Sequence, residues 1–413
     1  MTTVARPFRV DRNLWLLYAL GIFTMAQPGL AIWVVYLLDF RGLTLTQVGI
    51  MEAFFWAVKF VIEVPSGAVA DRFGRRATFW IGLIIEGAGV ATFAFASNFP
   101  ILLVSYVLWS TGFSFRSGND QAYIYDALAS DGRASEFSTR AGMFQALTTA
   151  AFTIAGIGGG VLAAATTLQV PMMLGVVPYL AGAVCLGLMQ EPPMPLGAHA
   201  HLRYMETLRT AFHALRSNRL VRYALLCQIA LETAMIAGIL LSQPFLQQHG
   251  VDLAWFGLLQ APVALAGAAA SIASARAARL LGIHRLAAYA LAAIVGGLVM
   301  LAAVDHRAAF AGFLAIHVAL GLAGPTISGY INDRTDSNIR ATIMSVVPLG
   351  TSLTFMIVGP FAGIVGDASL RLAFAGMAIV IALVAGASLL LWRRAEREGT
   401  SNPLARGAGE GGG

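Results

Sequence analysis

Charged side chains inside long apolar stretches are the groups of this chain best placed to do chemistry. Lys59, the single lysine, lies one helical turn before Glu63 within the apolar stretch Val48–Val69, so the two can pair. At a helical rise of about 1.5 Å per residue, Arg116 lies about 15 Å inward from Asp126, at the depth of Glu63. We expect Glu63 and Arg116 to face each other, as a structural ion pair or as part of a binding site. For Lys59 we favour a functional role, because a lone charge at this depth is costly.

A second set of polar groups lies in the later half of the chain. Glu232 is about 15 Å along a helix from Arg222, and no cation is visible at its depth on the neighbouring stretches. A carboxyl group in such a place can carry a proton. His317 is similarly deep and titrates easily, although each of the two can simply hydrogen-bond a neighbouring helix. Gln27 and Gln243 each precede a proline, so they mark either a cavity or a kink.

The segments that hold these groups have the length of membrane-spanning helices. The 413 residues are 58% hydrophobic and only 12% charged, and about 20 apolar residues cross a bilayer as a helix. The sequence therefore predicts an all-α membrane protein with twelve transmembrane helices. The predicted spans are Leu14–Leu38, Val48–Val69, Ala77–Ala96, Ile101–Tyr125, Phe137–Ala163, Met172–Met189, Tyr223–Phe245, Trp255–Ala275, Leu286–Val304, Ala308–Tyr330, Ile343–Val365 and Leu370–Trp392.

The formal net charge of +6 reflects topology and not a nucleic-acid surface. Arginines cluster before the first span and after each even-numbered one, whereas the opposite connections hold only Arg41, Arg307 and Arg371. Cations favour the cytoplasmic side of membrane proteins. We therefore expect a multi-pass protein of the bacterial plasma (inner) membrane with both termini in the cytoplasm.

The short loop after the second span combines an acid with three arginines. Its sequence, Gly-Ala-Val-Ala-Asp-Arg-Phe-Gly-Arg-Arg over residues 67–76, resembles the G-x-x-x-D-R-x-G-R-R loop of the major facilitator superfamily of secondary transporters. The resemblance implies that the loop joins an acid on the fourth span in a latch that holds the outward-open state. The implied latch residues are Gly67, Asp71, Arg72, Gly74, Arg75, Arg76 and Asp126.

An internal repeat supports the same fold. An offset of 208 residues aligns 42–49 with 250–257 and Gly74 with Gly282, and Arg140-Ala141 recurs as Arg340-Ala341. Two parallel halves of six helices follow, as in the superfamily. We expect two pseudo-symmetric six-helix bundles at residues 1–190 and 221–395. Residues 191–220 are the expected cytoplasmic linker, with a surface helix over 204–215 as one interpretation, and residues 396–413 form the expected disordered tail.

These features predict a secondary active transporter that moves a small organic solute by alternating access. We favour proton-coupled export of the multidrug or metabolite type, because the cavity helices are apolar and carry few charges. One departure weakens the antiporter assignment: Gly156–Gly160 lacks the proline that drug antiporters carry in the fifth helix, and a Gly-Pro pair stands instead at Gly359-Pro360. The alternative is a proton-coupled importer of a nutrient or siderophore-like metal chelate, with Lys59 and Arg116 gripping an anion.

Other classes of protein lack support in the sequence. A receptor or an intramembrane enzyme is the competing class, but the H-E-x-x-H, G-x-S-x-G and nucleotide-binding glycine motifs are absent. Cys185 and Cys227 both lie in apolar spans, which argues against a metal or disulfide framework. We expect no enzyme activity, no cofactor, no metal and no nucleic-acid partner. The expected partners are a small-molecule substrate, protons and the lipid bilayer, and we expect a monomer.

Overall fold

The protein is helical throughout the part of the chain that the computed structural model describes, residues 8–193, 216, 218–335 and 339–401. This confirms the predicted all-α fold. Ten helices in these ranges are long and apolar enough to cross a membrane. Two other predicted spans, Leu14–Leu38 and Ile101–Tyr125, are divided into shorter helices at Ala26–Gln27 and at Ser117–Gly118.

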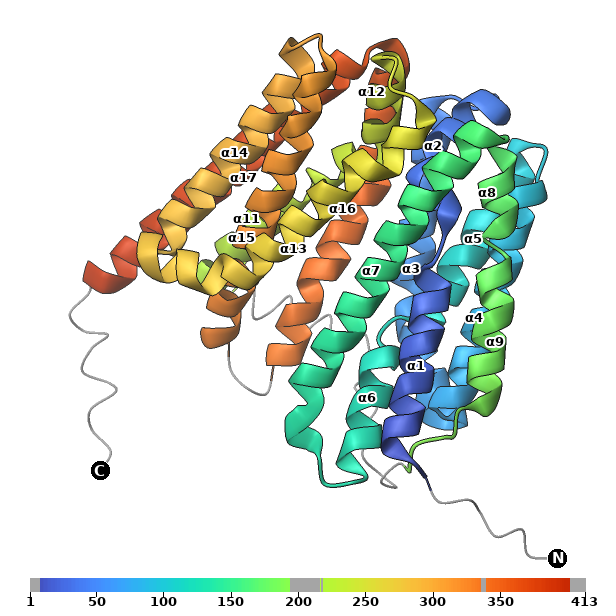
Figure 1. The fold of residues 1–413 in the computed structure, drawn as a ribbon. Helices are drawn as coiled ribbons and strands as arrows, with labels where there is room; N and C mark the ends of the chain where they lie inside the picture. Colours follow the sequence, from blue (N-terminus) through green and yellow to red (C-terminus); the bar gives the residue numbers. More distant parts are fainter. Residues whose placement is uncertain (1–7, 194–215, 217, 336–338, 402–413) are drawn as a thin grey trace, which may run out of the picture. The chain divides into compact units, whose positions relative to one another are not determined.

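The chain forms two compact units, Met1–His201 with Gly250–Ala261, and Leu202–His249 with Pro262–Gly413 (Figure 1). The helices of the first unit are α1 (Val10–Met25), η1 (Pro28–Ala31), α2 (Trp33–Val35), η2 (Tyr36–Phe40), α3 (Leu45–Phe73), α4 (Arg75–Phe95), α5 (Phe99–Arg116), α6 (Asn119–Ala129), η3 (Ala134–Glu136), α7 (Phe137–Ala165), α8 (Gln169–Leu174), α9 (Val177–Leu188) and η5 (Leu253–Trp255). Those of the second are α11 (Arg219–Glu232), η4 (Ala237–Leu241), α12 (Ser242–Gln248), α14 (Ile283–Ala303), η6 (Arg307–Phe310), α15 (Ala311–Asp333), α16 (Arg340–Ala368) and α17 (Leu370–Ser401). Helix α13 (Phe256–Leu281) has residues in both.

Proline and glycine place the breaks. Helix α1 ends at Met25, and Pro28 opens the 3₁₀ turn η1 after an extended Gln27. Because proline lacks an N–H group and fixes its φ angle, it disfavours continuation of the preceding helix and suits the first turn of the next one. In the second unit α11 ends at Glu232, and the π-helical turn η4 follows. Such π-turns occur mostly within α-helices and are frequent at functional sites.

The internal repeat is visible in the backbone. Gly42 and Gly250 have φ angles of 67° and 64°, and Gly74 and Gly282 have φ angles of 88° and 75°. Both pairs are related by the offset of 208 residues. Glycine adopts these left-handed conformations without a steric penalty. The helix starts that follow each pair are therefore built in the same way in the two halves.

Small residues let α4 and α5 pack closely. A Cβ atom at Gly82 would lie 2.9 Å from the carbonyl oxygen of Gly112, and one at Gly89 would lie 2.5 Å from the amide nitrogen of Trp109. Either contact is too short for a real side chain. The approach brings polar groups on these two helices within bonding distance of each other.

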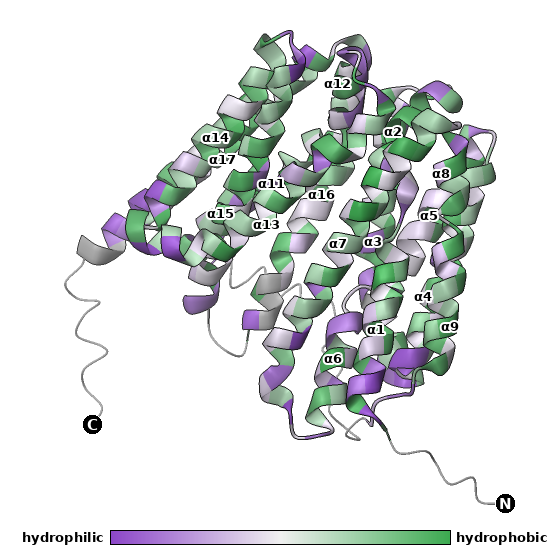
Figure 2. Ribbon diagram, viewed as in Figure 1, coloured by the Kyte–Doolittle hydropathy of each residue, from purple (hydrophilic) through white to green (hydrophobic). Residues whose placement is uncertain are grey.

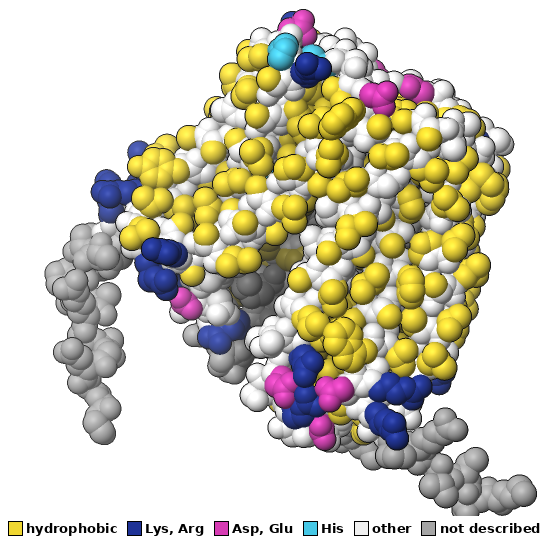
Figure 3. Space-filling model, viewed as in Figure 1, with side chains coloured by type: hydrophobic (Ala, Val, Ile, Leu, Met, Phe, Trp, Pro, Cys, Tyr) yellow, Lys and Arg dark blue, Asp and Glu magenta, His cyan; other side chains and the backbone are white. Residues whose placement is uncertain are grey.

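Apolar side chains cover the outer helix faces of each unit. Ile272 is 88% exposed and Ile154 is 69% exposed, and apolar colour extends along the helices while polar residues gather near their ends (Figure 2). Hydrophobic side chains dominate the visible face in the same way (Figure 3). Exposed apolar surface of this extent is typical of a protein surrounded by lipid.

The last helix extends into the predicted tail. Helix α17 continues to Ser401, so residues from Glu396 to Ser401 are helical, although we had assigned them to the disordered tail. The predicted surface helix over 204–215 lies outside the described residues.

Candidate transport site

The charged segment 67–76, which we had expected to be a loop, is almost entirely helical: α3 continues to Phe73 and α4 begins at Arg75, so Gly74 alone separates them. This segment forms an ion-pair cluster with α6. The Nε atom of Arg75 donates to Asp126 Oδ2 at 3.0 Å, and the Nη1 atom of Arg75 lies 4.0 Å from Asp71 Oδ1. The side chains of Arg75 and Asp126 are only 8% and 10% exposed, whereas that of Asp71 is 27% exposed. The amide of Asn119 donates to the backbone carbonyl of Arg75 at 2.9 Å. Arg75 is thus fixed to α6, while Asp71 stays accessible.

A carboxylate from the end of the sixth span caps α4. Glu191 accepts hydrogen bonds from the backbone amides of Arg75 at 2.6 Å and Arg76 at 2.8 Å. A Cβ atom on Gly74 would lie 2.6 Å from the Glu191 carboxylate, so the glycine leaves room for this acid. Negative charge is favourable at a helix N-terminus because the first amides are unpaired and the helix dipole is positive there.

Arg76, whose backbone amide binds Glu191, also uses its side chain to bind the end of α9. Its guanidinium donates to the carbonyl oxygens of Leu186 at 3.3 Å and Gly187 at 3.0 Å, at the C-terminal end of α9. Arg72 points elsewhere, with its guanidinium 5.2 Å from the centre of the Phe73 ring. Space is open around Gly67. The loop arginines therefore have three separate structural surroundings.

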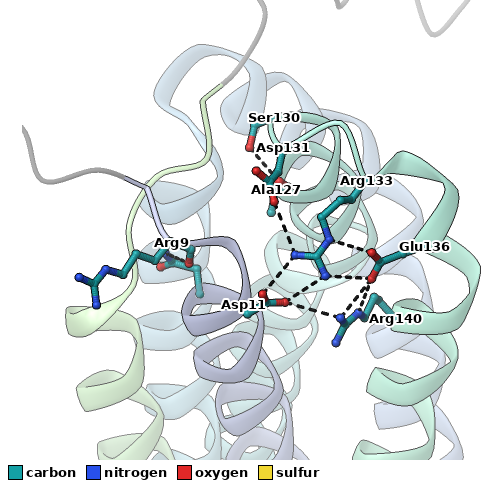
Figure 4. A network of polar contacts seen from close by, with 9 residues as sticks. Arg9, Asp11, Ala127, Ser130, Asp131, Arg133, Glu136 and Arg140 are labelled. Carbon is teal, nitrogen blue, oxygen red and sulfur yellow. Dashed lines mark hydrogen bonds and ion pairs between the residues drawn. The ribbon is translucent and has the colours of Figure 1, made fainter.

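A second ion-pair network fixes the end of α1. Arg133 donates to Asp11 at 3.1 Å and to Glu136 at 2.7 Å, and Arg140 donates to Glu136 at 3.1 Å. These side chains converge from α1, the connection after α6, η3 and α7 (Figure 4). Hydrogen bonding to Glu136 and Asp11 raises the pKa of Arg133.

Arg116 does not pair with Glu63, and this expectation was wrong. Arg116 makes a two-point ion pair with Glu86 on α4, at 3.0 and 3.2 Å, and its Nη1 atom lies 3.9 Å from Asp120 Oδ2. Tyr179 donates to the same Glu86 carboxylate at 3.0 Å. Glu86 therefore neutralises Arg116. The side chains of Arg116 and Glu86 are 5% and 2% exposed, so the pair locks helices together.

Lys59 has aromatic neighbours in place of an acid. Its ammonium lies 4.9 Å from the centre of the Trp56 ring and 5.5 Å from that of Phe113. Among the described residues, no carboxylate oxygen is within 4.0 Å of it. Glu63 is exposed. Ring faces attract a cation without neutralising its charge, so Lys59 can still bind an anionic group.

Glu52 and Gln27 are both tied to side chains of the first unit. The Trp56 indole donates to Glu52 at 3.3 Å, which connects Glu52 to the Lys59 aromatic cluster one turn away. Gln27 is 5% exposed, and its amide donates to the carbonyl of Thr24 at 3.3 Å. Gln27 therefore supports the break after α1 from within the first unit.

Glu232 lies in a hydrogen-bonded cluster of the second unit. Gln228 donates to its Oε1 atom at 3.0 Å, and Thr351 on α16 donates to its Oε2 atom at 2.6 Å. Gln228 also bonds to Ser328 on α15 at 3.0 Å. No cation among the described residues forms an ion pair with Glu232. The carboxyl group thus links three helices through neutral donors.

His317 lies apart from this cluster. Its Nδ1 atom is 2.9 Å from the carbonyl oxygen of Phe313, one turn earlier on α15. A Cβ atom at Gly238 would lie 3.2 Å from the imidazole Cε1 atom, and one at Gly267 would lie 3.4 Å from the His317 Cβ atom. The imidazole ring therefore packs beside Gly238 in η4, and the His317 Cβ atom packs beside Gly267 in α13. Gly238 is six residues beyond Glu232 along the seventh span. Glu232 and His317 therefore have separate partners.

Sequence reasoning missed several members of these clusters. Glu191, Gln228 and Thr351 bond to groups that the sequence had singled out. Tyr179 and Ser328 extend the same clusters through Glu86 and Gln228. Only Glu191 carried a usable signal. It follows the sixth span directly, and an offset of 205 aligns it with Glu396 after the twelfth.

Membrane-spanning helices in two repeated halves, with a charged loop and polar groups buried inside the spans, define a membrane transporter. The sequence matches the Major Facilitator Superfamily over residues 14–342. The chain therefore belongs to the Major Facilitator Superfamily, as its charged loop and repeat predicted.

Relatives are similar over part of the chain. The quinolone resistance protein NorA of Staphylococcus aureus (strain MRSA252) is 29% identical over 153 residues, which cover 36% of this chain and 38% of NorA. The uncharacterized MFS-type transporter YxaM of Bacillus subtilis (strain 168) is 28% identical over 106 residues, covering 26% of this chain and 25% of YxaM. The matches thus span well under half the length of these relatives.

Solved structures show the same fold over nearly the whole chain. The nucleoside transporter NupG has a TM-score of 0.74 at 14% identity, covering 93% of this chain and 98% of NupG. A bacterial homologue of the human lysosomal transporter Spinster, inward-facing and unoccupied, has a TM-score of 0.75 at 16% identity, covering 94% of this chain and 98% of that one. At these identities the likeness establishes the fold alone.

Proposed function

We propose that this protein is a proton-coupled exporter of small amphipathic organic compounds. It works by alternating access in the bacterial plasma membrane, with both termini in the cytoplasm. The observation that carries the proposal is Glu232, a carboxyl group inside a membrane span that bonds to neutral donors and to no cation among the described residues.

The surroundings of Glu232 suit a proton carrier. Gln228 and Thr351 donate to the two oxygens of the Glu232 carboxyl group, and both donors are neutral. Because these donors come from α11 and α16, movement between the two helices would change the hydrogen bonds at the carboxyl group and so couple protonation to conformation.

Lys59 and its aromatic neighbours are the proposed substrate contact in the first unit. A planar compound can stack on Trp56 or Phe113 while a carboxylate on it binds the Lys59 ammonium. Similarity to a quinolone resistance protein supports an aromatic substrate of this kind. Arg116 is excluded from this role because Glu86 already neutralises it.

The Arg75 cluster is the proposed latch. The ion pair between Arg75 and Asp126 is nearly buried, whereas Asp71 is accessible and 4.0 Å from Arg75. We assign to Asp71 the part of the latch that engages in one state and releases in the other. Arg75, Arg76 and Gly74 would hold the loop in shape for it.

The second candidate function is uptake of an anionic nutrient or metal chelate with protons. The observation in its favour is that Lys59 has no carboxylate partner within ion-pair distance among the described residues. Arg116 is already paired with Glu86 and so cannot serve as a second cation for the substrate. This weakens the uptake hypothesis, because an importer of a multiply charged anion would need more than one available cation.

Transport in inside-out membrane vesicles tests the proposal. Vesicles with an acidic interior should accumulate a quinolone inside, because protons leave as the compound enters. Vesicles without a pH gradient should only equilibrate it. Loss of preloaded compound from acidic vesicles, faster than leakage through protein-free vesicles, would instead indicate proton-coupled uptake into the cell and contradict export.

A further inference from the structure

A basic pocket lies at the end of the second unit where α14 begins and α17 ends. It has a volume of about 330 Å³ and is lined by His284, Arg285, Arg393, Glu396 and Arg397. Dark blue arginine side chains gather at this end of the unit (Figure 3). Three arginines outnumber the single acid, so the pocket favours an anion.

The first amides of α14 point into this region without a side-chain partner. Gly282 precedes the helix with a φ angle of 75° and provides no side-chain cap. Within the described residues, no side chain bonds to the amides of Ile283, His284 or Arg285. Nothing lies within 4 Å of a Cβ atom placed on Gly282. A helix N-terminus of this kind is a ready anion site.

The internal repeat shows what such a site holds in the first half. There the equivalent amides, those of Arg75 and Arg76 after Gly74, bind the Glu191 carboxylate at 2.6 and 2.8 Å. The same backbone conformation, at the aligned glycine, therefore binds an anion in this molecule. It is an internal precedent for the site, independent of the basic pocket.

The acid that corresponds to Glu191 is engaged elsewhere in the second half. Glu396 bonds to the His284 imidazole and accepts from Arg334 at 3.3 Å. Arg393 donates to the backbone carbonyl of His284 at 2.7 Å, which fixes one wall of the pocket. Arg285 is exposed and takes part in no ion pair among the described residues. The second half thus keeps the anion site but recruits no side chain of its own to fill it.

We propose that this pocket binds the phosphate of an anionic phospholipid, of which phosphatidylglycerol is the probe. Leu280, two residues before Gly282, is 76% exposed, and Tyr289 on α14 and Leu390 on α17 are each 58% exposed. These apolar side chains offer the acyl chains a path alongside the bound head group. Basic pockets between membrane helices bind anionic head groups in this way. The inference does not depend on the direction or coupling of transport.

Thermal unfolding of the purified full-length protein in neutral detergent tests it. Phosphatidylglycerol, phosphatidylethanolamine or inorganic phosphate is titrated, and the affinity follows from the rise in the unfolding midpoint. Phosphatidylglycerol should stabilise the protein most. Arg285→Gln should weaken its binding about fivefold, whereas Arg394→Gln should leave it unchanged, because Arg394 is an exposed arginine that does not line the pocket.

Three outcomes would overturn the proposal. Equal weakening by Arg285→Gln and Arg394→Gln would show unspecific attraction of anionic lipid. Equal stabilisation by both lipids would show that the net charge of the head group is not recognised. Stabilisation by inorganic phosphate as strong as that by phosphatidylglycerol would identify a free anion site.

Discussion

The charged side chains described within the spans are of two kinds, which differ in whether they have an ionic partner. Arg116 is neutralised by Glu86, with Asp120 also close, and Tyr179 donates to the Glu86 carboxylate, all within the first unit. Among the described residues, Glu232 bonds to neutral donors, and Lys59 lies beside aromatic rings with no carboxylate within ion-pair distance, although Glu63 attracts it from further away. A fully paired charge stabilises one arrangement of helices, whereas a charge without an ionic partner is available for a substrate or a proton.

The Glu86–Arg116 pair should be structural, which single and double substitutions test. Glu86→Gln alone leaves a buried guanidinium with only Asp120 near it and should destabilise the first unit by about 3–5 kcal/mol. Glu86→Gln combined with Arg116→Gln removes both charges and should cost clearly less. Thermal unfolding in detergent measures both. A double variant less stable than the single one would contradict this account.

Helical rise predicts how deep a side chain lies along a span but not which way it faces. The sequence correctly placed the charged residues within the spans and predicted the all-α fold. It paired Glu63 with Arg116 because the two share a depth, yet Glu86 reaches Arg116 through the glycine contacts between α4 and α5. Such a contact depends on which helix faces meet, which a single sequence does not contain.

The two halves cap equivalent helices, α4 and α14, in different ways. Gly74 and Gly282 share a left-handed conformation, at φ angles of 88° and 75°, and the repeat in the sequence was enough to align them. The sequence did not predict that Glu191 caps the first of these helices while Glu396 does not cap the second. Glu191 and Glu396 align in sequence, but their side chains bond to different partners.

Alanine substitutions at these two glycines separate backbone strain from the cap. Gly282→Ala should cost about 1 kcal/mol, because its φ angle is unfavourable for alanine while its surroundings are open. Gly74→Ala carries the same strain and also displaces the Glu191 carboxylate, whose cap is worth about another 1 kcal/mol. The unfolding midpoint should therefore fall further for Gly74→Ala. Equal falls would show that Glu191 contributes nothing as a cap.

At the scale of the whole molecule, the alternating arginines predict the orientation in the membrane. With Cys185 and Cys227 replaced by alanine, single cysteines at Ser97 and Arg307 should react with an impermeant reagent added to intact cells. A cysteine at Ala129 should react only after the membrane is opened. All three positions are exposed. The reverse pattern would place the termini outside.

Proton coupling through Glu232 can be tested by one comparison in proteoliposomes. Glu232→Gln keeps the size and hydrogen-bonding capacity of the side chain but cannot titrate. Accumulation of a transported quinolone driven by a pH gradient should disappear in this variant. Exchange of labelled for unlabelled compound should continue, because exchange needs no net proton movement. If Glu232→Gln still accumulates the compound against its gradient, Glu232 does not carry the proton.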